Sequence, residues 1–111
     1  MSGADEEDVL VVGGGPAGAA CALWAHQLGL RVRLLEGCRA IGGLQRRSPY
    51  TNRWIPGLQD KTGQEVAAQL QAHLRAAAVP HSVGFHVVSI GRNAVLGSWE
   101  VSSACRTHRA R

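Results

Sequence analysis

The strongest constraint on the fold is a glycine-rich turn between a short apolar run and a helix-like pattern. Residues 9–12 read as a buried parallel strand, since they are all apolar and are followed at once by glycines. The turn has the order G-x-G-x-x-G, with its glycines at Gly13, Gly15 and Gly18. In this order the first glycine allows a tight turn, the second lets a pyrophosphate approach the backbone, and the third lets the helix pack closely on the strand. The sequence therefore predicts a phosphate-binding turn.

A helix and a second strand should complete a βαβ unit after the turn. We expect the helix over residues 16–28, because Pro16 suits its first turn and Gly29 its end. Its unpaired amides and partial positive charge would favour an anion. The apolar spacing assigns the buried face of this helix to Ala20, Leu23, Trp24, Gln27 and Leu28.

The second strand, expected over residues 31–36, ends on a carboxylate. Glu36 follows Gly18 by eighteen residues, near the spacing of about 20 that places an acid on an adenosine ribose hydroxyl. Its charge would repel a 2′-phosphate, which argues against NADP as the first nucleotide. The unit therefore predicts a dinucleotide as the bound partner.

The rest of the chain has weaker signals. A long connection over residues 37–61 is too apolar for a solvated linker, so it should fold back over the nucleotide site. Thr62 and Glu65 form a capping-box pattern at the start of a second helix, which Pro80 ends. Strands are expected over residues 83–90 and 98–101, the latter antiparallel.

Length limits the architecture to one domain. With 111 residues, only one of the two halves of a doubly wound dinucleotide-binding domain is visible. We predict an α/β fold, a partial Rossmann-like parallel sheet with flanking helices and a truncated β-meander. An acidic tail over residues 1–7 would precede the domain at 8–103, and a basic, disordered tail would occupy 104–111. The exposed sheet edge favours pairing with another chain, such as a homo-oligomer.

Composition disfavours several other classes of function. The formal charge is +4, but the arginines are scattered and the aromatic residues few, so no nucleic-acid partner is expected. The acidic N-terminus and the lack of a long apolar run favour a cytoplasmic protein without membrane spans. Three cysteines without C-x-x-C spacing indicate neither a metal site nor a disulfide framework, and His73, His81 and His86 lack metal-ligand spacing. We expect Cys21 in the core and regard Cys38 as a weak candidate for a reactive thiol.

Several motifs together resemble a known family. Beside the glycine turn and Glu36, the chain has a Gly42-Gly43 pair, an Arg-Trp-Ile-Pro-Gly segment at 53–57 and a helix opening Thr-Gly-Gln-Glu-Val at 62–66. Over residues 8–101 this pattern resembles the FAD-dependent pyridine nucleotide-disulfide oxidoreductases, most closely their thioredoxin reductase branch. The resemblance implies that FAD is the cofactor.

The resemblance also implies roles for individual residues. The pyrophosphate of FAD would lie on Gly13, Gly14, Gly15, Pro16, Ala17 and Gly18. Glu36 would bind the adenosine ribose, and Gly42 and Gly43 the adjoining part of the cofactor. Gln45 and Asn52 would lie towards the flavin, although the usual Gly-Gly-Gln-Leu order is Gly-Gly-Leu-Gln in this chain.

Departures from the family limit the expected activity. Leu44 follows the glycine pair where the glutathione reductase branch has Thr-Cys, and the C-x-x-C pair and NADPH-binding domain of the thioredoxin reductase branch are absent from these residues. No residue stands out as a catalytic acid, base or nucleophile. We therefore expect the FAD-binding portion of an NAD(P)H-dependent flavoprotein oxidoreductase, incomplete and inactive as it stands, with NAD(P)H a co-substrate only in a full-length relative. The alternatives are the first unit of a flavin monooxygenase-like oxidoreductase and a non-catalytic, truncated dinucleotide-binding fragment.

Overall fold

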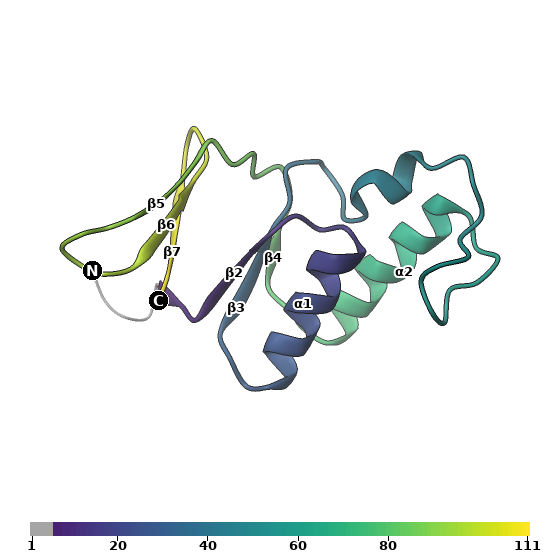
Figure 1. Cartoon of the computed structure of the whole chain (residues 1–111), viewed down its shortest axis with the longest axis horizontal. Helices are drawn as coiled ribbons and strands as arrows, with labels where there is room; N and C mark the ends of the chain where they lie inside the picture. Colours follow the sequence, from purple (N-terminus) through teal and green to yellow (C-terminus); the bar gives the residue numbers. More distant parts are fainter. Residues whose placement is uncertain (1–5) are drawn as a thin grey trace.

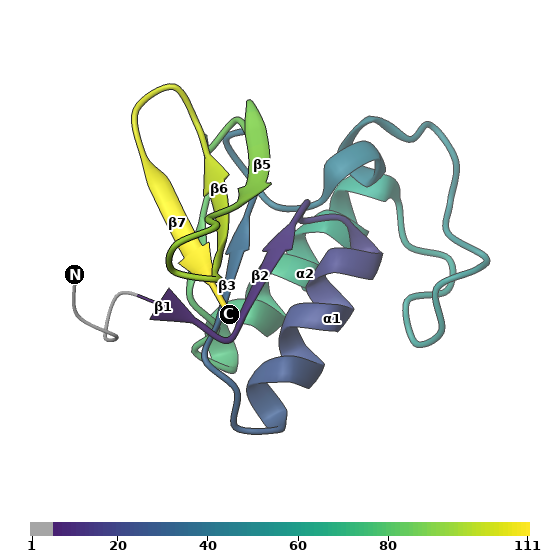
Figure 2. The ribbon, with the colours of Figure 1, turned by 60° about the vertical axis from the view of Figure 1, so that its left-hand side comes forward.

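The computed structural model describes residues 6–111, which form three layers (Figures 1 and 2). The middle layer is a parallel sheet in the order β2-β3-β4, made of β2 (Val9–Val12), β3 (Val32–Leu35) and β4 (His81–Ser82). Helices α1 (Pro16–Gln27) and α2 (Gly63–Ala76) cover one face of this sheet. The predicted α/β, partial Rossmann-like fold is confirmed.

The other face of the parallel sheet is covered by a second, four-stranded sheet. It has the order β1-β7-β6-β5, made of β1 (Glu6–Glu7), β5 (Ser89–Arg92), β6 (Trp99–Ser102) and β7 (Thr107–Ala110). The β5, β6 and β7 strands pair in antiparallel fashion as a meander, whereas β1 pairs parallel to β7. The core is accordingly divided in two: Val11 and Leu34 lie in the cluster under α1, and Leu35, Phe85 and Val101 form the cluster under the meander.

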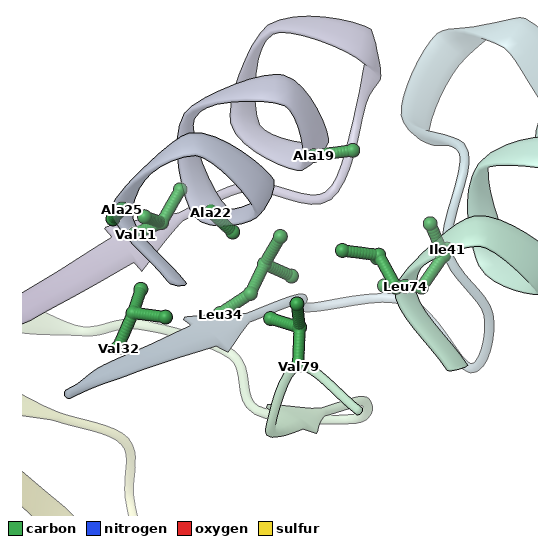
Figure 3. Close-up of a cluster of buried hydrophobic side chains, with 9 residues drawn as sticks. All are labelled: Val11, Ala19, Ala22, Ala25, Val32, Leu34, Ile41, Leu74 and Val79. Carbon is green, nitrogen blue, oxygen red and sulfur yellow. The ribbon is translucent and has the colours of Figure 1, made fainter. Parts of the chain in front are cut away.

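Helix α1 buries a different face from the one that its apolar spacing predicts. Its buried residues are all alanines, Ala19, Ala22 and Ala25, and they belong to the same buried cluster as Val11 and Leu34 of the sheet (Figure 3). Trp24 and Leu28, which we expected inside, are 68% and 71% exposed. The reason is the close approach of α1 to the sheet, which leaves room only for methyl groups. Cys21 is likewise exposed, contrary to its expected place in the core.

Helix α2 begins with the predicted capping box. The Thr62 hydroxyl oxygen accepts a hydrogen bond from the Glu65 backbone amide at 3.1 Å, and the Glu65 carboxylate accepts one from the Thr62 amide at 3.0 Å. Such a cap stabilises a helix by about 1 kcal/mol. The hydrogen bonds from Thr62 also hold the pKa of Glu65 below its ordinary value. Neither helix in residues 6–111 is long and apolar enough to cross a membrane.

The prediction of a strand over residues 83–90 is wrong. Strand β4 ends at Ser82, and the chain then turns at Gly84, where φ is +67°, to cross from one sheet to the other. The crossing is held at Glu36 and Cys38, whose carbonyl oxygens accept the amides of Phe85 and Gly84. These bonds follow the end of β3 instead of continuing a ladder, so regular pairing resumes only at Ser89.

The prediction of disorder over residues 104–111 is also wrong, because residues 107–110 form β7. This strand lacks an apolar pattern, but it lies between two partner strands, β1 and β6. The basic residues in it and just after it form ion pairs with acidic residues. Arg109 pairs with Glu100 of β6 at 2.8 Å, and Arg111 lies 3.5 Å from both Glu6 and Asp8. The expected acidic tail therefore contributes β1 at its end, while residues 1–5 lie outside the described part of the chain.

The surroundings of His108 in β7 disfavour the charged form of its side chain. The ring of His108 packs on Phe85 with centroids 5.2 Å apart, and its Nε2 atom is buried without a hydrogen-bond partner. Burial lowers the pKa of His108 below the ordinary 6.5, and the charges of Arg33 and Arg106 lower it further against the opposing effect of Glu7.

We expect the free energy of unfolding to fall as the pH is lowered from 6.5. Below this value the unfolded chain takes up a proton at His108 that the folded chain resists, so the loss begins near 6.5 and is complete below the folded pKa. Urea unfolding between pH 7.5 and 5 measures the loss. In the His108→Gln variant this part of the pH dependence should vanish, and an unchanged slope would assign it to other groups.

Candidate functional site

The glycine turn joins β2 to the N-terminus of α1. Gly13 has φ of +106°, a conformation that favours glycine, and its amide donates to the Leu35 carbonyl oxygen at 2.8 Å. Gly15 is the N-cap residue of α1, yet no side chain caps the helix and its first turn holds no acid. Because the first amides of a helix have no acceptor within the helix, this end is a site for an anion.

The glycines of the turn differ in what surrounds them. A Cβ atom at Gly18 would overlap the Gly13 carbonyl oxygen, and one at Gly14 would lie 2.9 Å from a methyl carbon of Ile41 and 3.1 Å from the Glu36 carboxylate. A Cβ atom at Gly15, by contrast, would meet no atom within 4 Å. Gly14 and Gly18 are therefore needed for internal packing, whereas Gly15 faces open space at the helix N-terminus.

The structure brings Glu36 to the turn, as its spacing predicts. The residue is only 6% exposed. One of its carboxylate oxygens accepts the Gly14 amide at 2.8 Å, and the other accepts the Cys38 amide at 2.7 Å. Each oxygen of a carboxylate can accept a second hydrogen bond. Glu36 is thus held rigidly beside the turn and still has acceptor capacity for a hydroxyl group.

The predicted glycine pair lies against the same turn. The Gly42 amide donates to the Gly14 carbonyl oxygen at 2.9 Å, and a Cβ atom at Gly43 would lie 3.4 Å from the Cα atom of Gly15. Gly42 has φ of +131°, and a Cβ atom there would overlap Ala67 of α2. The pair therefore fits tightly between the turn and α2, and this part of the long connection does fold back onto the site.

The remainder of the connection is a loop over residues 48–61 that extends outward beyond the helices (Figure 1), with Tyr50 and Trp54 72% and 79% exposed. Its residues Ile55, Pro56 and Leu58 line one pocket together with Pro16 at the start of α1. Gln45 lies half-buried in a short 3-10 helix, η2 (Gly43–Arg47). The Asn52 side chain is used inside the loop: its amide group donates to the Ile55 and Leu58 carbonyl oxygens, and its oxygen accepts two backbone amides. Its expected place towards the flavin stays a prediction.

Two contributors to the site were missed in the sequence. Ile41 is 1% exposed and packs beside Gly14, and Gly63 at the start of α2 is packed against the Gln45 carbonyl so closely that a Cβ atom would overlap it. In the sequence, the only indication of these two roles is the residue type itself, an apolar side chain at position 41 and a glycine at position 63. The three cysteines are free and exposed, and within residues 6–111 no cluster of histidine, cysteine and acidic residues could hold a metal ion.

The parallel sheet, the glycine turn at a helix N-terminus and the acid at the end of the next strand define a Rossmann-like dinucleotide-binding domain. The family of FAD dependent oxidoreductases matches residues 8–95, and the chain belongs to this family.

Comparisons with individual proteins are consistent with membership of this family. The ferredoxin–NADP reductase of Limosilactobacillus fermentum is 34% identical over 103 residues, which are 90% of this chain and 31% of the relative. The thioredoxin reductase of Streptococcus pyogenes superposes with a TM-score of 0.82 at 25% identity, covering 96% of this chain and 33% of that structure. A flavin-containing monooxygenase from Stenotrophomonas maltophilia, with a TM-score of 0.78 over 96% of this chain and 37% of its own, shares the fold at 21% identity. The chain thus spans about a third of each of these three proteins, and its fold is that of the thioredoxin reductase FAD-binding domain.

Proposed function

We propose that this chain binds FAD through its ADP half, as the FAD-binding part of an NAD(P)H-dependent oxidoreductase that resembles thioredoxin reductase. The pyrophosphate would lie on the turn made by Gly13, Gly14, Gly15, Pro16, Ala17 and Gly18. Glu36 would accept a hydrogen bond from the adenosine ribose, and the Gly42-Gly43 pair and Gln45 would lie along the cofactor beyond the pyrophosphate.

The observation that carries the proposal is the open space at Gly15. A dinucleotide needs backbone that it can approach closely, amides without acceptors, and an acid for the ribose. Gly15 offers backbone that can be approached closely, at the uncapped N-terminus of α1. The acid is Glu36, whose buried carboxylate accepts a hydrogen bond from the amide of the neighbouring Gly14. The residues present therefore fit an ADP group.

The chain's own part in the reaction would be binding and orientation. The redox chemistry, acceptance of hydride from a reduced nicotinamide nucleotide, is supplied by FAD when bound. The Gly13–Gly18 turn would fix the diphosphate by amide donors, and Glu36 would disfavour a nucleotide with a 2′-phosphate because two negative charges would meet there.

The proposal is tested by the substitution Gly15→Ala, which adds a single methyl group to the turn. The φ of −75° at Gly15 suits alanine and no protein atom lies near, so Gly15→Ala should leave the free energy of unfolding within about 0.5 kcal/mol of the original chain. The methyl group would occupy the space that the diphosphate needs. We expect the affinity for FAD and for ADP to fall about tenfold or more, a change of about 1.4 kcal/mol, measured by isothermal titration calorimetry.

Gly91→Ala is the matched control. Gly91 lies in β5, and a Cβ atom there also meets no atom within 4 Å, so both stability and nucleotide affinity should stay as they are. The proposal is overturned if the unaltered chain binds neither FAD nor ADP, or if Gly15→Ala binds both as tightly as the unaltered chain does.

A further inference from the structure

Helix η2 and the loop after it carry basic and aromatic side chains on their surface. Residues 37–61 contain five basic residues and one acid, Asp60. Three arginines and three apolar side chains of this stretch are exposed, and we call the set the basic loop surface: Leu44, Arg46, Arg47, Tyr50, Arg53 and Trp54. In Figures 1 and 2, η2 and the loop lie together at one end of the molecule, beside the N-terminus of α2.

The arginines of the basic loop surface lack the acidic partners that other arginines of the chain have. Ion pairs with acidic residues are formed by Arg33, Arg109 and Arg111. Among residues 6–111, no ion pair involves Arg46, Arg47 or Arg53. A charged side chain without a partner is costly to bury against protein. This surface therefore suits either water or a partner with negative charge.

The loop is held in shape by its own hydrogen bonds. The buried side chain of Asn52 donates to two carbonyl oxygens of the loop, and its oxygen accepts the Trp54 amide at 3.1 Å. At the base of the loop, the Asn52 amide donates to the Lys61 carbonyl oxygen at 2.8 Å. Trp54 is thus exposed on a backbone that is already fixed. Little conformational entropy would be lost when its ring meets a partner.

We propose that the basic loop surface binds to the surface of a membrane that contains anionic lipids. The arginines would attract the anionic headgroups. The rings of Tyr50 and Trp54 are of the kind that lies at the level of the headgroups, with the apolar part towards the acyl chains. Leu44, which is 83% exposed, would add an apolar contact at the same level. The protein would lie on the membrane without spanning it.

An acidic protein would match the charges of this surface less well in shape. A stable protein interface covers about 800 Å² on each partner, whereas this loop projects beyond the helices (Figure 1). A layer of headgroups can surround a projecting loop, so that its charged and its apolar side chains both find partners there. The inference goes beyond the proposed binding of FAD and does not depend on it, since no residue of the glycine turn and no part of Glu36 enters it.

The test measures binding of the full chain to two kinds of vesicle, by sedimentation. One kind is phosphatidylcholine alone, and the other contains about one third phosphatidylserine, with affinity for the second expected to be about tenfold higher or more and to fall as salt is added. In a chain with Trp24→Phe and Trp99→Phe, the fluorescence of Trp54 should shift to shorter wavelength only with the anionic vesicles. Absence of binding, or equal binding to both kinds, would overturn the proposal.

Paired variants separate this surface from the general positive charge of the chain. Arg46→Gln combined with Arg47→Gln should weaken binding to anionic vesicles about 25-fold, since each arginine near such a surface contributes about fivefold. Arg75→Gln with Arg106→Gln removes the same charge from exposed positions elsewhere and should change the affinity little. Equal losses in the two double variants would assign the binding to net charge and contradict the proposal.

The aromatic part has its own matched pair. Trp54→Ser should weaken binding about tenfold, the effect of withholding about 60 Å² of ring surface from an apolar environment. Trp24→Ser, at a similarly exposed tryptophan on α1, should leave it unchanged. A fluorescent polyglutamate peptide tests the alternative partner. If the chain binds this peptide but no vesicle, and the Arg46 and Arg47 double variant loses the peptide, the surface belongs to an acidic protein and the proposal fails.

Discussion

Gly18→Ala should lower the free energy of unfolding by about 3 kcal/mol. The new methyl group would overlap the backbone carbonyl oxygen of Gly13 and would lie 2.9 Å from the carbonyl carbon of the same residue and 3.4 Å from a methyl carbon of Val11. A backbone atom cannot swing aside as the end of a flexible side chain can, so α1 must move off the sheet and loosen the packing of Ala19 and Ala22 against it. Urea unfolding monitored by circular dichroism measures the loss.

The same chemical change three residues earlier is the control. Gly15→Ala adds a methyl group to the same turn but into open space, so it should unfold at the urea concentration of the original chain. If Gly18→Ala and Gly15→Ala prove equally stable, then α1 does not approach the sheet as closely as the structure has it. The explanation of its all-alanine buried face would then fail as well.

The βαβ unit could be predicted from the sequence because its signals are local. Glycine order, the acid at the end of the next strand, and the Thr62–Glu65 capping box each depend on residues that are close together in the chain, and each describes a backbone requirement. The family resemblance rested on the same residues and is confirmed by the match over residues 8–95. The turn and Glu36 do lie together, through the Gly14 amide.

The buried face of α1 could not be predicted in this way. Its sequence is apolar almost all around, with Ala19, Ala22 and Ala25 on one side and Leu23 and Trp24 on another. Periodicity then favours the larger side chains. Which side turns inward is decided by the distance between helix and sheet, and that distance is set by Gly18 and Gly13, so the smaller residues are buried.

Strand β7 and Asn52 escaped prediction for a related reason. β7 pairs with β1 and β6, and Arg109 and Arg111 meet the acids Glu100 and Glu6, so all its partners are in other strands. The Asn52 side chain forms its hydrogen bonds with the loop that follows it, a structural role that the family likeness does not predict. In each case the deciding interaction depends on a conformation that the local pattern does not encode.

Glu36→Ala should lower the free energy of unfolding by about 3 kcal/mol and weaken nucleotide binding as well. The substitution leaves the Gly14 and Cys38 amides without their acceptor, and an unsatisfied buried donor costs about 1–3 kcal/mol. Gly14 is packed between Ile41 and the carboxylate, so water replaces the lost oxygen poorly. Urea unfolding gives the stability, and faster hydrogen exchange at these two amides would locate the damage.

Glu36→Gln distinguishes the carboxylate's two tasks. Glutamine has the same shape but a single oxygen acceptor, so it can satisfy only one of the two amides well, and its stability should lie between those of the alanine variant and the original chain. It also removes the negative charge. Titration with ADP and with its 2′-phosphorylated form should therefore show a smaller preference for the unphosphorylated nucleotide than in the original chain. A preference that Glu36→Gln leaves intact would remove Glu36 from the ribose site, even if the stability loss shows that it holds the turn.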